Sequence, residues 1–164
     1  MTFSPEHWKV PNLVLSRELF DRLLDLELKR SFRYQSFTSL LLMEAASGTG
    51  PSPRERHSDG FLEKMARLMR KALRETDIVG TGEGKLAVIL VHSDSHTAQI
   101  VGDRLLGWVS NYLGSTEVGG GCSFRMGGAC FPSHATDPKG LFQKAGEMLE
   151  RSRQQTGNRV FISE

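Results

Sequence analysis

The sequence predicts an α/β (α+β) domain in which helices pack against one central sheet. Short, continuous apolar runs such as Thr38–Ala45 are typical of buried strands. Longer segments between these runs repeat their apolar residues at helical spacing. In chain order the segments follow the pattern α-β-α-β-β-α-β-α-β, and this alternation around one hairpin predicts a single shared sheet.

Four segments have the pattern of amphipathic helices. They cover residues 16–33, 59–75, 95–112 and 137–154. Ser16 is the expected N-cap of the first helix, Ser58 or Asp59 of the second, and Asp137-Pro138 begins the last because proline suits a first helical turn. The apolar face of the first helix is expected to contain Leu19, Phe20, Leu23, Leu24, Leu26 and Leu28.

Five segments are expected to be strands: Thr38–Ala45, Asp77–Thr81, Lys85–Val91, Cys122–Cys130 and Arg159–Ile162. The second and third are joined by the turn Gly82-Glu83-Gly84, which predicts a hairpin. No repeat or linker divides the chain. We therefore expect an N-terminal extension over residues 1–15 and one domain over residues 16–164.

The composition favours an ordinary globular protein. The chain has 164 residues, of which 38% are hydrophobic and 24% charged. A net charge of only +2 argues against a partner that is a nucleic acid. The sequence contains neither a long apolar run nor a signal-peptide pattern, so a cytoplasmic location with no membrane partner is expected.

The cysteines and histidines do not suggest a disulfide or a metal site. Cys122 and Cys130 would lie roughly 26 Å apart on one strand, too far to bridge each other. The five histidines are scattered and have no ligand spacing with the cysteines. We expect two reduced thiols and no bound metal.

Three stretches with the expected spacing resemble the GGDEF domain of diguanylate cyclases. RYQSFTSLLLME is similar to the first strand of that family, and FLEKMARLMRKALRETDIV to the helix and strand before its signature hairpin. RMGGACFPSHATDPKGLFQKAGEMLERSRQQTGNRV is similar to its C-terminal strand, helix and Gly-Arg-Asn-Arg ending. The likeness covers about Ser16 to Phe161 and implies a five-stranded, palm-like sheet surrounded by helices.

The same resemblance implies that the catalytic carboxylates are lost. Diguanylate cyclases use two metal ions, which need hard oxygen ligands. Where the family has its acidic signature pair, this chain has Gly84 and Lys85, and an ammonium group repels a metal ion. Glu83 could be shifted toward that position, but one carboxylate does not restore the site. We expect no cyclase activity, no catalytic residue and no metal.

Other positions keep only part of the nucleotide site that the resemblance implies. Glu44 stands where the family has its first metal-binding aspartate, and Ala46 replaces the second acid. Asp59 matches a guanine-contacting aspartate, although an N-cap explains it equally well. Arg153 replaces a phosphate-binding lysine, and Gly157 an arginine. Glu44, Asp59, Glu83 and Arg153 are therefore interpreted as remnants of a nucleotide site.

One part of the family's pattern is retained. Arg74-Glu75-Thr76-Asp77 matches the Arg-x-x-Asp motif at which many cyclases bind their product, cyclic di-GMP, and Arg104 falls on a further arginine of that site. An arginine fork can meet guanine N7 and O6 with two hydrogen bonds, while a carboxylate can accept from the opposite edge. Two simpler readings stay open: a solvated salt bridge, or Arg74 capping the last carbonyls of its helix.

Three functions follow from these observations. The first is a non-catalytic cyclic di-GMP receptor that uses Arg74, Asp77 and Arg104, with a protein partner in signalling and a possible ligand-dependent homodimer. The second is a ligand-free scaffold for protein–protein interaction. The third is a residual cyclase that uses Glu44 and Glu83. In the first case the dinucleotide is a ligand, and no cofactor is expected.

Overall fold

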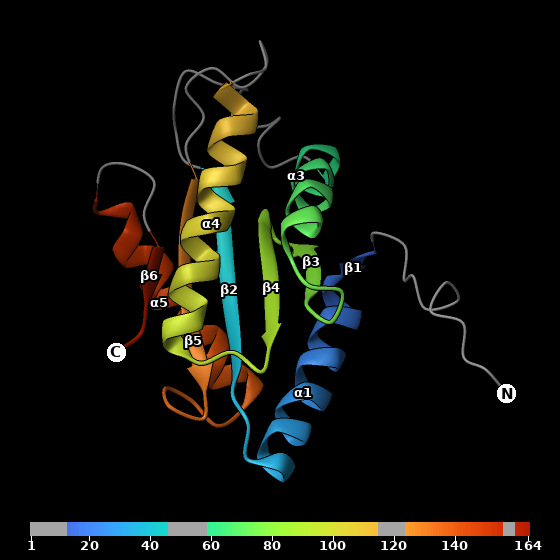
Figure 1. Cartoon of the computed structure of the whole chain (residues 1–164), viewed down its shortest axis with the longest axis vertical. Helices are drawn as coiled ribbons and strands as arrows, with labels where there is room; N and C mark the ends of the chain where they lie inside the picture. The colour runs from blue at the N-terminus through green and yellow to red at the C-terminus, as the bar shows by residue number, and fades with distance from the viewer. Residues whose placement is uncertain (1–12, 46–58, 115–123, 156–159) are drawn as a thin grey trace, which may run out of the picture.

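Over the residues that the structure describes, the molecule is a three-layer sandwich, with two helices on each face of one sheet (Figure 1). The computed structural model describes residues 13–45, 59–114, 124–155 and 160–164. The strands are β1 Val14–Ser16, β2 Thr38–Ala45, β3 Ile78–Gly82, β4 Lys85–Val91, β5 Phe124–Phe131 and β6 Val160–Ile162. The helices are α1 Arg17–Tyr34, α3 Asp59–Ala72, α4 Ser95–Gly114 and α5 Pro138–Arg153. The predicted fold class is confirmed.

The sheet has the order β1-β3-β4-β2-β5-β6. The strand β2 lies in its centre, antiparallel to both β4 and β5, and all of its residues are buried. This confirms the expected central strand beside the hairpin. A strand covered on both faces needs apolar residues at successive positions, which explains the continuous run in this segment.

The strand count differs from the prediction by one. Residues 14–16, assigned mostly to the N-terminal extension, form the edge strand β1, which runs parallel to β3 with Val14 opposite Val79. A three-residue strand is too short to show an alternating pattern, so its sequence gives no periodic signal. Within the described residues the sheet therefore has six strands rather than five.

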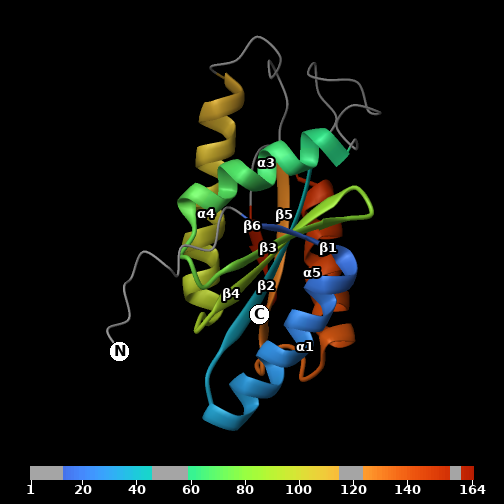
Figure 2. The ribbon, with the colours of Figure 1, turned by 90° about the vertical axis from the view of Figure 1, so that its right-hand side faces the viewer.

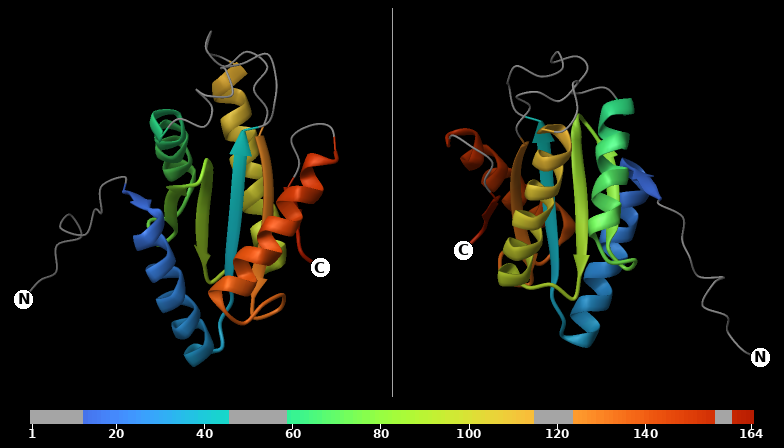
Figure 3. Two further views of the ribbon diagram at one scale, coloured as in Figure 1. Left: turned by 180° about the vertical axis from the view of Figure 1, so that it is seen from behind. Right: turned by 45° about the horizontal axis from the view of Figure 1, so that its top comes forward.

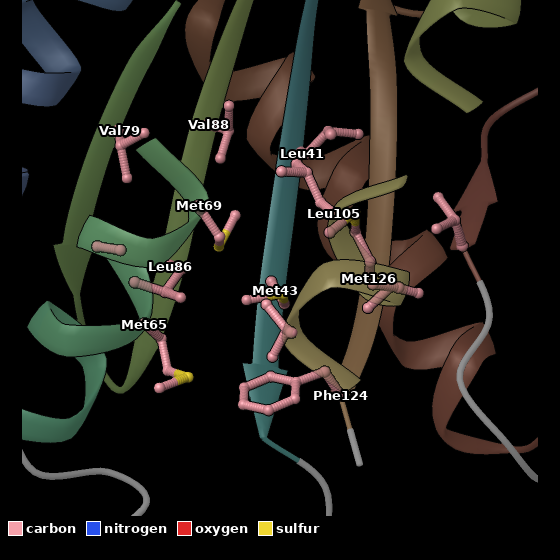
Figure 4. Packing of buried hydrophobic residues seen from close by; sticks show 14 of the residues in the cluster. Leu41, Met43, Met65, Met69, Val79, Leu86, Val88, Leu105, Phe124 and Met126 are labelled. Carbon is pink, nitrogen blue, oxygen red and sulfur yellow. The ribbon is translucent and has the colours of Figure 1, made fainter. Parts of the chain in front are cut away.

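Each face of the sheet has its own apolar core. On one face, α3 and α4 pack over alternate residues of β2 such as Leu41 and Met43 (Figure 4). On the other face, α1 and α5 cover the sheet (Figure 3) and pack over Leu40 and Leu42. The edge-on view in Figure 2 separates these two helical layers.

The first helix begins where the sequence predicts. The Ser16 hydroxyl accepts a hydrogen bond from the Leu19 backbone N–H at 3.5 Å. The apolar residues that this helix buries are Phe20, Leu24 and Leu28, which are spaced four positions apart on one stripe. The expectation that Leu19 and Leu26 belong to the buried face is wrong: they are 45% and 59% exposed, because the sheet covers a narrower stripe than the leucine pattern suggests.

The hairpin turn is tighter than predicted. Gly82 belongs to β3 and pairs with Lys85, which leaves Glu83 and Gly84 as a two-residue turn. Both have positive φ, 53° and 73°, as a type I′ turn requires. Glycine adopts this conformation freely, whereas Glu83 holds it at a cost of about 1–2 kcal/mol.

The described residues bear on two further expectations, the absence of a membrane-spanning helix and the reduced state of the cysteines. Among the described helices, none is long and apolar enough to span a bilayer. Cys130 is a buried free thiol, and burial raises its pKa. Cys122 lies outside the described residues.

Candidate functional site

The residues singled out by the sequence fall into two groups at opposite ends of β4. Lys85 begins this strand and lies across from Glu44, one position beyond the last pair of the β2–β4 ladder. Val91 ends it, and its backbone bonds to the side chains of Arg74 and Asp77. A seven-residue strand spans about 20 Å. The two groups are therefore separate candidate sites.

At the first site, Glu44 is held by Arg153. Arg153, the last residue of α5, donates from Nε and Nη2 to the two carboxylate oxygens of Glu44 at 2.6 and 2.8 Å. The Glu44 side chain is only 10% exposed, so this two-pronged pair is largely shielded from water. Hydrogen bonding to Glu44, together with its charge, raises the pKa of Arg153. The guanidinium also pairs with Glu150.

The hairpin adds no further carboxylate to this site. Glu83 lies in the turn with its side chain 77% exposed, and its nearest cation is Arg17, whose Nη1 is 3.4 Å away. Gly84 completes the turn, and Lys85 lies beside Glu44 on the same face of the sheet. Over the ranges that the structure describes, no three His, Cys, Asp or Glu side chains gather around one point. These described residues do not fit a two-metal site.

The other positions that the resemblance assigns to the nucleotide site are Asp59, Ala46 and Gly157. Asp59 is the first residue of α3. Ala46 and Gly157 lie outside the described residues, as does the loop between β2 and α3. The structure thus brings together Glu44 and Arg153 and leaves Glu83 apart from them.

At the second site, Arg74 and Asp77 form a turn instead of the end of a helix. The prediction that this helix extends to about Glu75 is wrong, because α3 ends at Ala72. The Asp77 backbone N–H donates to the Arg74 carbonyl at 3.0 Å, as in a β-turn. The Asp77 carboxylate in turn accepts from the Arg74 N–H at 3.1 Å, which favours the turn over another turn of helix.

Asp77 is buried, whereas Arg74 is open to solvent. The Asp77 side chain is 3% exposed and also accepts from the Val91 N–H at 3.2 Å. The Arg74 side chain is 54% exposed; its Nη2 donates to the Val91 carbonyl at 2.9 Å and its Nε lies 3.5 Å from Asp77. The Asp77 carboxylate thus joins the 74–77 turn to the end of β4. Contact between Asp77 and a guanine stays a prediction, and the geometry gives this residue a second role, the positioning of Arg74.

Arg104 caps the end of α3, and Arg70 binds the turn that follows it. Arg104 on α4 donates from Nη2 to the Ala72 carbonyl at 2.8 Å. Arg70 donates to the carbonyls of Arg74 and Asp77. The reading in which Arg74 caps its own helix is therefore wrong, since its guanidinium bonds to Val91. Three arginines, Arg70, Arg74 and Arg104, surround the 72–77 segment, and we call them the arginine cluster.

Arg70 is the member of this cluster that sequence reasoning missed. It precedes Arg74 by four residues, the spacing that places two side chains on the same side of a helix. Basic residues in a last helical turn also commonly bond to the free carbonyls at that end. Both signals are present in the sequence, but neither belongs to the Arg-x-x-Asp motif.

A family model described as "Diguanylate cyclase, GGDEF domain" matches residues 55–159. Comparison with curated protein sequences gives no significant match.

Solved structures share the fold at low sequence identity. The GGDEF domain of PA1120 (YfiN or TpbB) from Pseudomonas aeruginosa superposes with a TM-score of 0.77 and 20% identity, over 94% of this chain and 99% of that one. The GGDEF domain of DgcB from Caulobacter crescentus, in complex with c-di-GMP, has a TM-score of 0.74 and 14% identity over 91% of each chain. The active GGEEF domain of a diguanylate cyclase from Vibrio cholerae has a TM-score of 0.74 and 13% identity, over 93% of this chain and 99% of that one.

Proposed function

Because the chain belongs to the GGDEF domain family of diguanylate cyclases, we propose that it is a member without cyclase activity that binds cyclic di-GMP at the arginine cluster. The observation that carries the first half of this proposal is the pairing of Glu44 with Arg153 at 2.6 and 2.8 Å. The second half rests on the exposed guanidinium groups of Arg74 and Arg104 beside one rigid turn.

Loss of activity follows from the charges around Glu44. A two-metal site for phosphoryl transfer needs carboxylates that are free to bind cations. Both oxygens of Glu44 already bind Arg153, and the neighbouring position on β4 carries the ammonium of Lys85. A divalent ion would have to displace a buried, two-pronged pair and then lie beside a cation, which Coulomb repulsion disfavours.

Ligand binding follows from the donors that the arginine cluster keeps free. Each guanidinium has five N–H donors, of which the structure shows one bond to a backbone carbonyl for Arg74 and one for Arg104. The remaining donors of Arg74 can face guanine N7 and O6 or a phosphate. Because Asp77 and Arg70 hold the turn from beneath, Arg74 is positioned before the ligand arrives, which limits the entropy lost on binding.

One observation favours a second function, a scaffold for a protein partner. Phe32 and Tyr34, at the end of α1, and the nearby Phe37 are 79%, 66% and 44% exposed. Exposed aromatic side chains are enriched at protein–protein contacts. The two functions are compatible, since this end of α1 and the arginine cluster involve different residues. One structural neighbour, the diguanylate cyclase SiaD from Pseudomonas aeruginosa, is known in complex with its activator SiaC.

Calorimetric titration with cyclic di-GMP tests the proposal. We expect wild-type protein to bind, Arg74→Ala to weaken binding roughly 5- to 150-fold through loss of a bidentate contact, and Arg104→Ala to weaken it less. Arg67→Ala is the matched control, because Arg67 lies exposed on α3, seven residues before Arg74, and among the described residues it pairs with Glu63. Sedimentation of the complex shows whether the ligand produces a dimer.

Incubation with GTP and Mg²⁺ or Mn²⁺ tests the catalytic half separately. We expect no cyclic di-GMP above a heat-treated control. Product that disappears in Glu44→Ala would refute the inactive assignment. If wild type, Arg74→Ala and Arg104→Ala bind cyclic di-GMP with equal affinity, the ligand binds outside the arginine cluster. If wild type does not bind cyclic di-GMP at all, the scaffold function is favoured.

A further inference from the structure

A groove lies between α1 and α5 over the sheet, away from the arginine cluster. It has a volume of about 210 Å³. Its floor contains Leu42 of β2 and Ala87 of β4, and its walls contain Arg17 and Phe142. Lys85 and Glu83 lie at the hairpin end of the groove, and Gly146 of α5 borders it. The groove is thus largely apolar and carries charged groups at one end.

Lys85 is the charged residue of this groove for which the described part of the chain provides no counter-ion. Arg17 pairs with Asp21 at 2.9 Å and with Glu83 at 3.4 Å. Glu44 on β2 lies across from Lys85 on β4, but its carboxylate pairs with Arg153. Within the described ranges no acidic side chain lies within 4.0 Å of the half-buried Lys85 ammonium. A partly desolvated cation without an acid beside it favours an anion from solution.

The rest of the groove suits a flat apolar group. The ring of Phe142 meets Phe20 edge to face, with 6.3 Å between centroids, and the Arg17 guanidinium lies 4.5 Å above the Phe142 ring. These contacts fix one aromatic wall in place. At Gly146 an added Cβ would meet no atom within 4 Å, so the helix leaves open space where it passes the groove.

We propose that this groove binds a small organic anion, with its acidic group on Lys85 and an aromatic body against Phe142. The acidic group is a phosphate or a carboxylate, since an ammonium ion accepts either. Binding needs no divalent ion, because Glu44 is already neutralised by Arg153. The site is independent of the proposed cyclic di-GMP site, which lies at the other end of β4.

Titration of ¹⁵N-labelled protein with phenyl phosphate, benzoate and inorganic phosphate in the presence of EDTA tests the proposal. We expect phenyl phosphate or benzoate to bind with a dissociation constant on the order of 1 mM, and to shift amide signals of Lys85, Ala87 and Gly146. The more tightly bound of the two identifies the acidic group. Inorganic phosphate alone should bind at least about tenfold more weakly, because it lacks the apolar body.

Three variants locate the ligand. Gly146→Leu should fill the groove and abolish binding, and Lys85→Met should weaken it at least about tenfold. Gly107→Leu is the control: it is also a helical glycine with no atom within 4 Å of an added Cβ, but it lies on α4, on the opposite face of the sheet. Amide spectra and melting temperatures of each variant establish that it is folded.

Several results would overturn the inference. These are no shifts at about 10 mM of either aromatic anion, shifts centred outside the groove, or unchanged binding to folded Gly146→Leu. Loss of binding in Gly146→Leu with full retention in Lys85→Met would refute the anionic character of the ligand.

Discussion

Removal of Arg153 should destabilise the fold through Glu44. In the folded protein both oxygens of this carboxylate accept from Arg153, and its side chain is 10% exposed. In Arg153→Ala the carboxylate stays between β4, β5 and α5 without the cation that now neutralises it. The variant therefore measures the cost of a shielded carboxylate that has lost its two-pronged partner and keeps only the cross-strand cations Lys85 and Arg125 as neighbours.

The expected cost is moderate because one partner reaches solvent. Breaking a fully buried ion pair costs about 3–5 kcal/mol. Arg153 is 41% exposed, so water can enter beside Glu44 when the guanidinium is removed, and we expect about 1–3 kcal/mol. For a chain of this length that corresponds to a fall in melting temperature of about 2–12 °C. Glu44→Gln should cost less, about 1 kcal/mol, because it leaves only a cation near the surface.

Thermal and urea unfolding of the single and double variants provide the assay. A double-mutant cycle should give a coupling energy between Glu44 and Arg153 of about 1–2 kcal/mol. Arg151→Ala is the control, since Arg151 is an exposed arginine in the same turn of α5. Equal stability of Arg153→Ala, Arg151→Ala and wild type would refute the reasoning and reduce the pair to a solvated contact.

The pH dependence of this effect has a definite sign. Pairing with Glu44 raises the pKa of Arg153, so its contribution is complete below the unfolded value and is lost only as pH rises through the folded value. The unfolded pKa of arginine already lies above about 12. Titration of Arg153 should therefore not change the difference between wild type and Arg153→Ala between about pH 6 and 9.

Three further predictions concern other parts of the fold. Burial lowers the pKa of His134, whose Nδ1 accepts from the Cys130 N–H at 2.8 Å; stability should therefore fall as pH drops below about 6.5, and His134→Ala should lose this dependence in melting curves across pH. Gly127→Ala should cost about 3 kcal/mol or more, because its Cβ would lie 2.1 Å from a backbone nitrogen of α5, whereas Gly146→Ala should stabilise by up to about 1 kcal/mol; urea unfolding that ranks them otherwise would contradict this packing. Glu83→Asn should raise stability by up to about 1 kcal/mol, since Asn-Gly suits the positive φ of the turn, and an unchanged melting temperature would show that the lost contact with Arg17 matters equally.

The sequence predicts the central part of the fold well. Strands such as Thr38–Ala45 and Lys85–Val91 are buried on both faces, so their apolar runs are long enough to recognise. The helix starts at Ser16 and Asp137 follow from local side-chain capping, which depends on neighbours in sequence alone. Elements fixed by contacts distant in sequence, such as β1 against β3, carry no such local signal.

In the candidate sites, too, local motifs could be recognised in the sequence, whereas contacts between distant residues could not. The positions of Glu44, Arg153 and Arg74 could be located from motifs, but the atoms that their side chains bind could not. Arg153 binds Glu44 across 109 residues of sequence, and Arg74 binds the Val91 carbonyl across 17. Side-chain exposure also depends on tertiary packing, which is why the burial of Asp77 could not be inferred from the Arg-x-x-Asp motif.

The most direct test of the central claim is a titration of the ¹⁵N-labelled chain with cyclic di-GMP. The proposed site predicts that shifted amide signals gather in the 72–77 turn, at Val91 and His92, and around Arg104, and that they vanish in Arg74→Ala. Signals of Lys85 and Gly146, at the other end of the sheet, should not move. No shift at saturating ligand, or shifts centred away from the arginine cluster, would contradict the claim that this GGDEF domain binds cyclic di-GMP there.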